Sequence, residues 1–188
     1  MATSKGQRIG IWAIAGIMLF GTLGSFFLPI LVNDSESQEA ESQQQLLEEY
    51  QKQAEEAAKA RLASSQPLEG YSADPFDKAA VTDLQVEVLS EGDGPVAAAE
   101  STVKANYFGW TSDGKIFDSS NQNGTTEPIE FSLNGVISGW TEGLTGIKQG
   151  SVVKLVIPAD KAYGEAGSPP NIGPNEPLAF IVQLVEVK

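Results

Sequence analysis

The hydrophobic and polar positions divide the chain into zones with different patterns. Residues 9–32 form an apolar run without a charged side chain, residues 33–63 are rich in Glu, Gln and Ala, and residues from 81 onward show short apolar runs between turn residues. Long apolar runs and runs of strong helix formers indicate helices, whereas short alternating runs indicate strands. The pattern therefore predicts an apolar helix, a polar helix and a strand-rich domain, in that order.

The segment 64–80 lies between the polar helix and the strand-rich region. It contains Pro, Gly, Ser and Asp residues that favour turns, and it is predicted as a linker. The region 81–188 combines strands with one short helix at 138–145, which predicts a small α+β domain. The predicted strands are Leu84–Leu89, Val103–Trp110, Lys115–Phe117, Ile129–Leu133, Val152–Pro158 and Leu178–Val187.

The apolar run 9–32 is long enough to cross a membrane. As a helix it would measure about 36 Å, against about 30 Å for the hydrocarbon core of a bilayer. Lys5 and Arg8 precede it and Asp34 follows it, so the positive-inside rule places residues 1–8 in the cytoplasm and the remainder outside the cell membrane. The alternative is a cleaved signal peptide, whose apolar region is shorter and ends in a small-x-small site that this run lacks. We therefore expect an uncleaved, single-pass anchor helix.

The polar zone 33–63 is predicted to be an acidic helical stalk, since it contains no Gly or Pro. A thin apolar stripe with 3-4-3 spacing could form a short coiled-coil seam and a weak homodimer. The alternative is a solvated stalk, which we favour because the stripe covers barely two heptads and half of it is alanine. The stripe consists of Leu47, Tyr50, Ala54 and Ala57.

Composition excludes several classes of function. The net charge of -13, from 25 acidic and 12 basic residues, argues against a nucleic-acid partner, because phosphate binding needs clustered Lys and Arg. The chain has no Cys and no His, so disulfides, thiolate catalysis, histidine-dependent triads and His-ligated metal sites are excluded. We expect no metal and no cofactor. Any catalysis must use carboxylates, hydroxyls, aromatic surfaces or backbone groups.

Several motifs in the strand-rich region are specific when taken together. They read V-x-A-x-Y-x-G, D-G-x-x-F-D-S-S, F-x-L, V-I-S-G-W-x-E-G-L and A-Y-G, and a loop then returns to L-x-F. In this order and at this spacing they resemble the FKBP-type peptidyl-prolyl cis-trans isomerases, and in particular membrane-anchored bacterial members. The segments concerned are Val103–Gly109, Asp113–Ser120, Phe131–Leu133, Val136–Leu144, Ala162–Gly164 and Ile172–Phe180.

The resemblance implies an FKBP-like antiparallel sheet wrapped around one short helix, here preceded by a transmembrane helix and a helical stalk. It also implies a proline-binding pocket. In the family the tryptophan is the pocket floor, here Trp140, while the N–H of Ile137 and the hydroxyl of Tyr163 would donate to a substrate carbonyl. The residues carried over are Tyr107, Phe117, Asp118, Ile137, Trp140, Tyr163 and Phe180 as the catalytic set, with Ile129, Val136 and Ile172 as substrate-binding residues.

Single residues of this set also have simpler interpretations. Trp140 alone would more often be core, and Asp118 could cap the turn that follows it. The sequence departs from the family at Ile129, where an aromatic residue is common, and in the loop after Tyr163. These departures concern the rim of the pocket, and with it substrate preference and affinity for a rapamycin-type macrolide.

X-Pro isomerisation fits a chain without His or Cys. The planar imide must twist through a barrier of about 18–20 kcal/mol, and no proton or covalent bond has to be transferred. An apolar pocket disfavours the more polar planar form relative to the twisted one. We therefore expect an isomerase that assists the folding of proline-containing extracytoplasmic polypeptides. The alternatives are a membrane-tethered proline-binding module or holdase with little turnover, and a structural role for the stalk.

Overall fold

The computed structural model describes residues 37–188, and side chains from residue 47 onward. The chain divides into two compact units, one ending at Ala60 and one running from Arg61 to Lys188. The predicted anchor, residues 9–32, lies outside the described residues. Within the described part, no helix combines the length and the apolar character needed to cross a bilayer.

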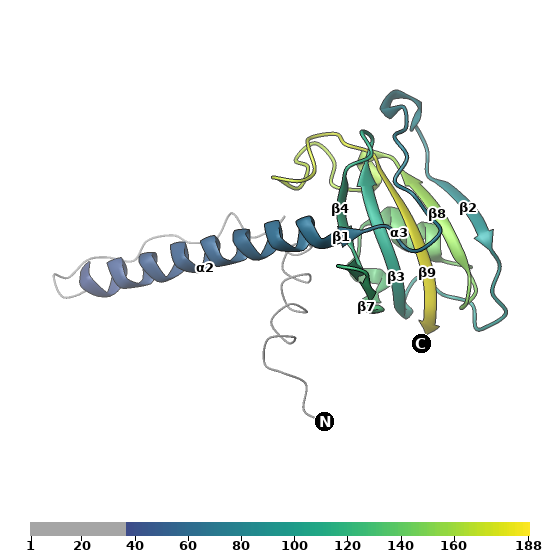
Figure 1. Cartoon of the computed structure of the whole chain (residues 1–188), viewed down its shortest axis with the longest axis horizontal. Coiled ribbons are helices and arrows are strands. Elements are labelled where there is room, and N and C mark those ends of the chain that lie inside the picture. The colour runs from purple at the N-terminus through teal and green to yellow at the C-terminus, as the bar shows by residue number, and fades with distance from the viewer. Residues whose placement is uncertain (1–36) are drawn as a thin grey trace. The chain divides into compact units, whose positions relative to one another are not determined.

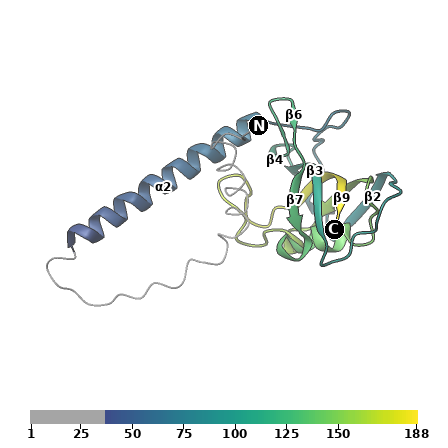
Figure 2. The same ribbon diagram turned by 90° about the horizontal axis from the view of Figure 1, so that it is seen from below.

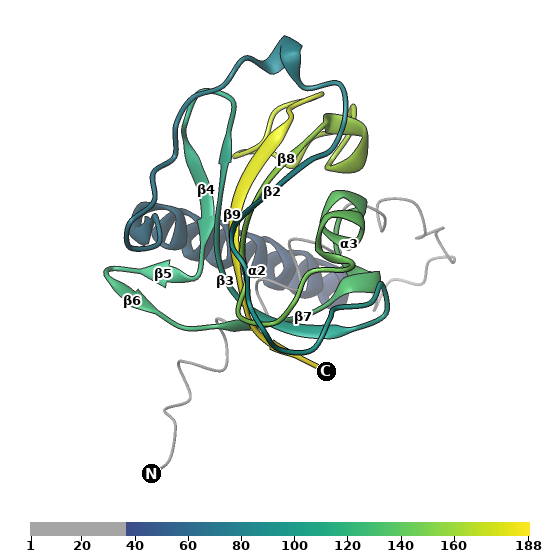
Figure 3. The ribbon, with the colours of Figure 1, turned by 90° about the vertical axis from the view of Figure 1, so that its right-hand side faces the viewer.

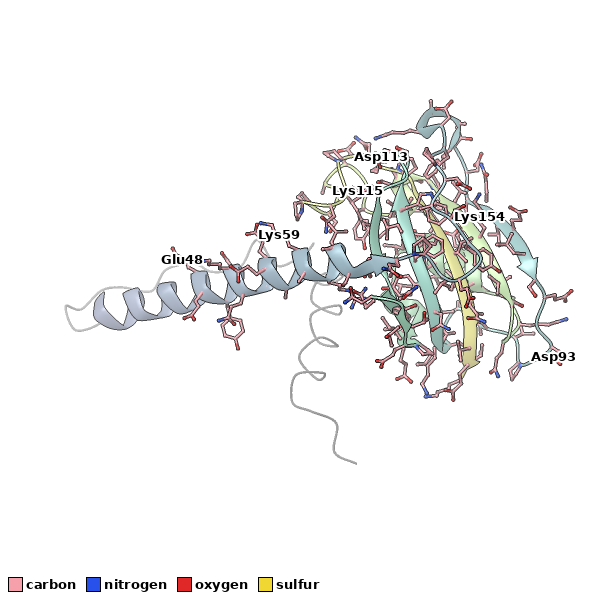
Figure 4. The ribbon with its side chains drawn as sticks, in the orientation of Figure 1. Glu48, Lys59, Asp93, Asp113, Lys115 and Lys154 are labelled. Atoms are coloured by element: carbon pink, nitrogen blue, oxygen red, sulfur yellow. The ribbon has the colours of Figure 1, made fainter. Side chains whose placement is uncertain are left out.

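Helix α2 (Ser37–Ser64) occupies the zone in which the sequence predicted a polar helix. Leu47 and Tyr50 of the predicted stripe are largely exposed, at 62% and 71%. Lys59 pairs with Glu55 one turn away at 2.8 Å, an exposed contact that adds little to stability. Figure 4 shows Glu48 and Lys59 on this helix. The dimer seam stays a prediction.

A six-stranded antiparallel sheet forms the body of the second unit, in the order β2-β8-β9-β3-β4, with β7 pairing with β3 (Figures 1 and 2). Every predicted strand is confirmed to within two residues at each end. The long central strands β3 and β9 pair along nearly their whole length. The strands are β2 (Gln85–Ser90), β3 (Thr102–Thr111), β4 (Ile116–Ser119), β7 (Ile129–Ser132), β8 (Val152–Ile157) and β9 (Leu178–Val187).

The short helix α3 (Ser138–Leu144) lies against one face of the sheet (Figure 3). Its glycines allow a close approach. A Cβ built on Gly139 would lie 2.3 Å from Ile157 Cγ2, and one on Gly143 would lie 2.8 Å from Leu155 Cδ2. Both aliphatic side chains belong to β8, so the helix backbone packs directly on that strand. Trp140 and Leu144 of α3 are buried in the main core beneath it.

The opposite face of the sheet is covered by residues 65–80, which we call the strap. Leu68 is buried there with Phe108 and Trp110 of β3. The indole N–H of Trp110 donates to the backbone carbonyl of Asp74 at 2.9 Å. The prediction of a linker at 64–80 is therefore corrected, because its apolar side chains cover a second hydrophobic cluster. The packed domain begins before residue 81.

The strap is joined to a small second sheet, β1-β5-β6. β1 (Ser65–Gln66) pairs with β5 (Asn121–Gln122), which pairs in turn with β6 (Thr125–Thr126). Asn123 and Gly124 connect β5 and β6 with positive φ angles of 53° and 81°, as a tight two-residue hairpin requires. Figure 3 shows β5 and β6 projecting beside β4. Short 3-10 turns occur at Lys78–Ala80, Leu133–Gly135 and Ala159–Lys161.

Candidate functional site

An aromatic cluster lies between α3 and the sheet. Tyr107 of β3, Phe131 of β7 and Trp140 of α3 contact one another edge to face, with ring centroids 5.2–5.4 Å apart. Trp140 also meets Phe180 of β9 at 5.4 Å, and Phe180 meets Phe117 of β4 at 5.5 Å. Edge-to-face pairs at these distances are favourable beyond the area that they bury. Three strands thus supply rings that contact one fully buried tryptophan, and β4 supplies a fourth ring that contacts Phe180.

The aliphatic residues predicted for the site gather on the same cluster. Ile129, Val136, Ile137 and Tyr163 are half-buried and pack against it, and Ile172 is buried within it. All ten residues that the sequence proposed are therefore brought into one region, with Asp118 joined to it through Tyr107. The half-buried members come from strand and helix ends and from the loop after the 3-10 turn at Ala159–Lys161. Their roles in binding or catalysis stay predictions.

Asp118 is the one charged side chain among the ten residues that the sequence proposed. Its Oδ1 accepts hydrogen bonds from Arg61 Nε at 2.8 Å and from the amide of Ser119 at 2.9 Å, and its Oδ2 accepts one from the hydroxyl of Tyr107. Glu142 of α3 pairs with Lys161 at the surface. Among residues 37–188 no three acidic side chains gather in a way that could hold a metal ion.

Arg61 was not found by sequence reasoning. It lies in the last turn of a helix whose composition predicts a solvated stalk, and 57 residues separate it from Asp118. The sequence gives one indirect indication that Asp118 is paired with a distant cation. The residues after Asp118, from Ser119 to Pro128, contain no Lys or Arg that could neutralise the carboxylate.

Two N–H groups in the cluster, one backbone amide and one indole, have no hydrogen-bond acceptor among the described residues. The amide of Ile137, the residue that precedes α3, donates to no backbone or side-chain acceptor between residues 37 and 188. The buried indole N–H of Trp140 likewise finds no acceptor there. A buried donor without an acceptor costs about 1–3 kcal/mol. The Ile137 amide is thus available to a carbonyl group of a bound molecule.

The two tyrosines of the site remain protonated well into the alkaline range. Burial, and after it the nearby charge of Asp118, raises the pKa of Tyr107 well above its usual value. The same two causes, in the same order, raise the pKa of Tyr163 to about 12. Both hydroxyls therefore act as hydrogen-bond donors, and neither acts as a base near neutral pH.

We expect these shifts to produce an alkaline loss of stability. A folded-state pKa above the unfolded value of about 10 stabilises the fold fully below pH 10, and this contribution disappears as the pH rises through the folded pKa. The free energy of unfolding in urea should therefore be level from pH 7 to about pH 10 and should fall toward pH 12. Ultraviolet titration of tyrosinate should show a component near pH 12 that Tyr163→Phe removes. Complete titration of all tyrosines near pH 10 in the folded chain would contradict this.

The comparisons with known proteins fit this geometry. The family model for FKBP-type peptidyl-prolyl cis-trans isomerase matches residues 94–185. The chain is 42% identical over 137 residues to the FKBP-type peptidyl-prolyl cis-trans isomerase FkpA of Escherichia coli K12, covering 73% of this chain and 50% of the relative. It is 42% identical over 114 residues to the peptidyl-prolyl cis-trans isomerase Mip of Coxiella burnetii, covering 61% and 49%. The chain thus spans about half the length of these curated relatives.

A solved structure shows the same fold. The crystal structure of a peptidyl-prolyl cis-trans isomerase from Pseudomonas syringae superposes with a TM-score of 0.52 at 34% sequence identity. The match covers 71% of this chain and 92% of that one. The structural match therefore covers more of this chain than residues 94–185, the part that the family model matches.

Proposed function

We propose that the second unit, residues 61–188, is an FKBP-type peptidyl-prolyl cis-trans isomerase that catalyses rotation about X-Pro peptide bonds, a proposal supported by the family model that matches residues 94–185. The observation that carries this proposal is the aromatic cluster. Trp140 is buried in a cluster against which half-buried Phe117 and Tyr163 pack, and the amide of Ile137 donates to no acceptor among the described residues. This arrangement offers an apolar surface and polar donors at its edge, which a prolyl imide requires.

The proposed chemistry needs no proton transfer. The planar imide carries partial negative charge on oxygen through resonance, and that resonance is lost as the C–N bond twists. Apolar rings solvate the polar planar form worse than water does, so they favour the twisted form relative to it. Each difference of about 1.4 kcal/mol between the two forms gives a tenfold acceleration. The raised pKa values of both tyrosines agree with this scheme, since neither would give up its proton.

Nine of the ten predicted residues contact the substrate in this proposal, and the tenth, Asp118, accepts a hydrogen bond from the hydroxyl of Tyr107. Trp140 is the floor on which the proline ring rests, and the rings of Tyr107, Phe117 and Phe180 are the walls. The amide of Ile137 and the hydroxyl of Tyr163 hold the substrate carbonyl while the prolyl nitrogen rotates, which orients the bond for the twist. The remaining aliphatic residues close the rim against water, namely Ile129, Val136 and Ile172.

The test is a protease-coupled isomerisation assay with a succinyl-Ala-Leu-Pro-Phe anilide peptide and the full chain in mild detergent. We expect clear acceleration by the unmodified chain. Trp140→Leu should lower kcat/KM at least about tenfold because the floor is lost, and Tyr163→Phe about fivefold, the equivalent of one hydrogen bond of about 1 kcal/mol. Tyr50→Phe, an exposed tyrosine on α2, is the matched control and should behave as the unmodified chain.

The same assay separates the isomerase from a proline-binding module or holdase. A binder would hold the peptide without accelerating its isomerisation, and variants of Trp140 would then change the affinity alone. Absence of acceleration by the unmodified chain would refute the enzymatic proposal. A rapamycin-type macrolide, proposed as a ligand of the same apolar cluster, should inhibit competitively.

We also propose that residues 9–32 anchor the chain in a cell membrane, with residues 1–8 in the cytoplasm and the isomerase unit outside. The proposal is supported by the length of the apolar run and by the placement of Lys5 and Arg8 before it. The clients would be exported, proline-containing polypeptides. Recovery of the chain in the soluble fraction after cell lysis would count against the anchor.

A further inference from the structure

The chain immediately after α2 is fastened to the loop that follows β4. Ser65 and Gln66 pair with Gln122 and Asn121 as two short antiparallel strands. The hydroxyl of Ser119 donates to the carbonyl of Gln66 at 2.6 Å. These bonds fix the backbone on both sides of the contact, so the last turn of α2 is held close to the end of β4.

Arg61 extends from this last turn to the carboxylate of the candidate site. Its Nε donates to Asp118 Oδ1 at 2.8 Å and its Nη2 donates to the carbonyl of Ser119 at 3.0 Å. The two charged side chains are only 24% and 23% exposed. On the other side the hydroxyl of Tyr107 donates to Asp118 Oδ2. A guanidinium, a carboxylate and a phenol thus form one continuous chain that ends in the aromatic cluster.

The residues around Asp118 offer no replacement for this cation. Arg61 is the only arginine between residues 37 and 188. Within that range it is also the ion-pair partner recorded for Asp118. A largely buried carboxylate whose cation is removed is costly, because its desolvation is no longer compensated. An uncompensated negative charge would also repel the carbonyl oxygen of an imide bound on the adjacent rings.

We propose that Arg61 is a positioning residue of the isomerase site, supplied by the segment that precedes the sheet. It holds the Asp118 carboxylate in one orientation and neutralises it, and the carboxylate in turn fixes the phenol of Tyr107 against the floor formed by Trp140. This inference rests on the proposed function, since it assigns Arg61 a part in that same site. The functional domain accordingly includes the end of α2.

The contact has geometry that a lysine cannot reproduce. A guanidinium presents several donors in a rigid fork and can hold the carboxylate and the neighbouring carbonyl together, whereas an ammonium group is a single point of charge on a flexible stem. Arg61→Lys should therefore retain the charge and lose part of the orientation. Arg61→Met removes both while keeping a side chain of similar length.

The experiment measures kcat/KM for the same proline peptide, and its Kd from tryptophan fluorescence, in the full chain. The variants are Arg61→Met, Arg61→Lys, Asp118→Asn and the double substitution Arg61→Met with Asp118→Asn. Lys59→Met is the matched control, since it removes an exposed cation from the same helix. Near-ultraviolet circular dichroism of each variant shows that the core is folded.

We expect Arg61→Met to lower kcat/KM about tenfold or more, as misplacement of a site group commonly does. The kcat/KM of Arg61→Lys should lie between that of Arg61→Met and that of the unmodified chain. Lys59→Met should leave kcat/KM unchanged. In the Asp118→Asn background, Arg61→Met should change kcat/KM less than about twofold, because the group that it positions is gone. That non-additivity distinguishes positioning from simple support of the fold.

Two results would overturn the proposal. One is unchanged kinetics of Arg61→Met. The other is an equal loss of kcat/KM from Arg61→Met in the unmodified chain and in the Asp118→Asn chain, which would mean that Arg61 only supports the fold. Failure of the isomerase proposal is recognised separately, by absence of acceleration in the unmodified chain. In that case the peptide Kd decides. Weaker binding by Arg61→Met but not by Lys59→Met would support the positioning role for a binding site, and equal binding would refute it.

Discussion

A fragment that begins at Lys78 is expected to unfold at a much lower urea concentration than one that begins at Arg61, although both contain every predicted strand and site residue. The shorter fragment lacks most of the strap, so Phe108 and Trp110, at 0% and 1% exposure in the structure, face water. Burial of each such side chain is worth about 1.5–3 kcal/mol, and the loss should therefore reach about 3 kcal/mol or more. Equilibrium urea unfolding followed by circular dichroism measures it.

A third fragment, beginning at Ser65, separates the strap from Arg61. It retains Leu68 and the bond from Trp110 to Asp74, so it should keep most of the stability of the longer fragment. It lacks the guanidinium, so its kcat/KM should fall as that of Arg61→Met does. If the fragment from Lys78 unfolded at the same midpoint as the fragment from Arg61, the strap would contribute nothing to the fold and the linker interpretation would be restored.

The second large effect is expected at Gly109, where β3 passes beneath two rings of the aromatic cluster. A Cβ at this position would lie 2.5 Å from Phe180 Cε1 and 2.6 Å from Phe117 Cζ. Neither aromatic ring can relieve this clash by rotating a flexible end group, because the two rings also pack edge to face against each other. Gly109→Ala should therefore displace both walls, destabilise the fold by about 1–3 kcal/mol as overpacking does, and reduce kcat/KM at least tenfold.

The matched control is Gly135→Ala, because a Cβ there meets no atom within 4 Å. Its stability and kinetics should equal those of the unmodified chain. Thermal unfolding and the peptide assay, applied to both variants, provide the comparison. Wild-type kinetics of Gly109→Ala would show that the rings of Phe117 and Phe180 are not the walls on which the substrate depends.

The strands and the site could be predicted because their signals are local or belong to one ordered set of motifs. In β9, for example, Leu178, Phe180 and Val182 occupy alternate positions that face the main core, while Ala179 and Ile181 between them face the second cluster. The site residues could be assembled because their motifs occur in a fixed order. Phe131 is buried in the core and contacts Trp140, a contact that only the pairing of β7 with β3 reveals.

The strap and Arg61 could not be predicted, for a different physical reason. Leu68, Tyr71 and Phe76 follow neither a helical nor a strand period, because an irregular segment covers a sheet face through whichever side chains happen to reach it. Turn residues between them dominate the pattern and indicate a loop. The role proposed for Arg61 rests on its contact with Asp118, which lies far away in the sequence. Nothing in the sequence of a polar helix distinguishes the basic residue that makes such a contact from those that face solvent.

The two tryptophans of residues 37–188 lie on opposite faces of the sheet, since Trp110 of β3 belongs to the cluster beneath the strap and Trp140 of α3 belongs to the main core. Trp110 donates its indole N–H to the strap, while Trp140 lies under the aromatic cluster with no acceptor among the described residues. Their emission therefore originates in two distinct environments within a single domain. In the fragment that begins at Arg61, phenylalanine at one position or the other would leave a single tryptophan. Detachment of the strap and occupation of the ligand surface could then be followed separately by tryptophan emission.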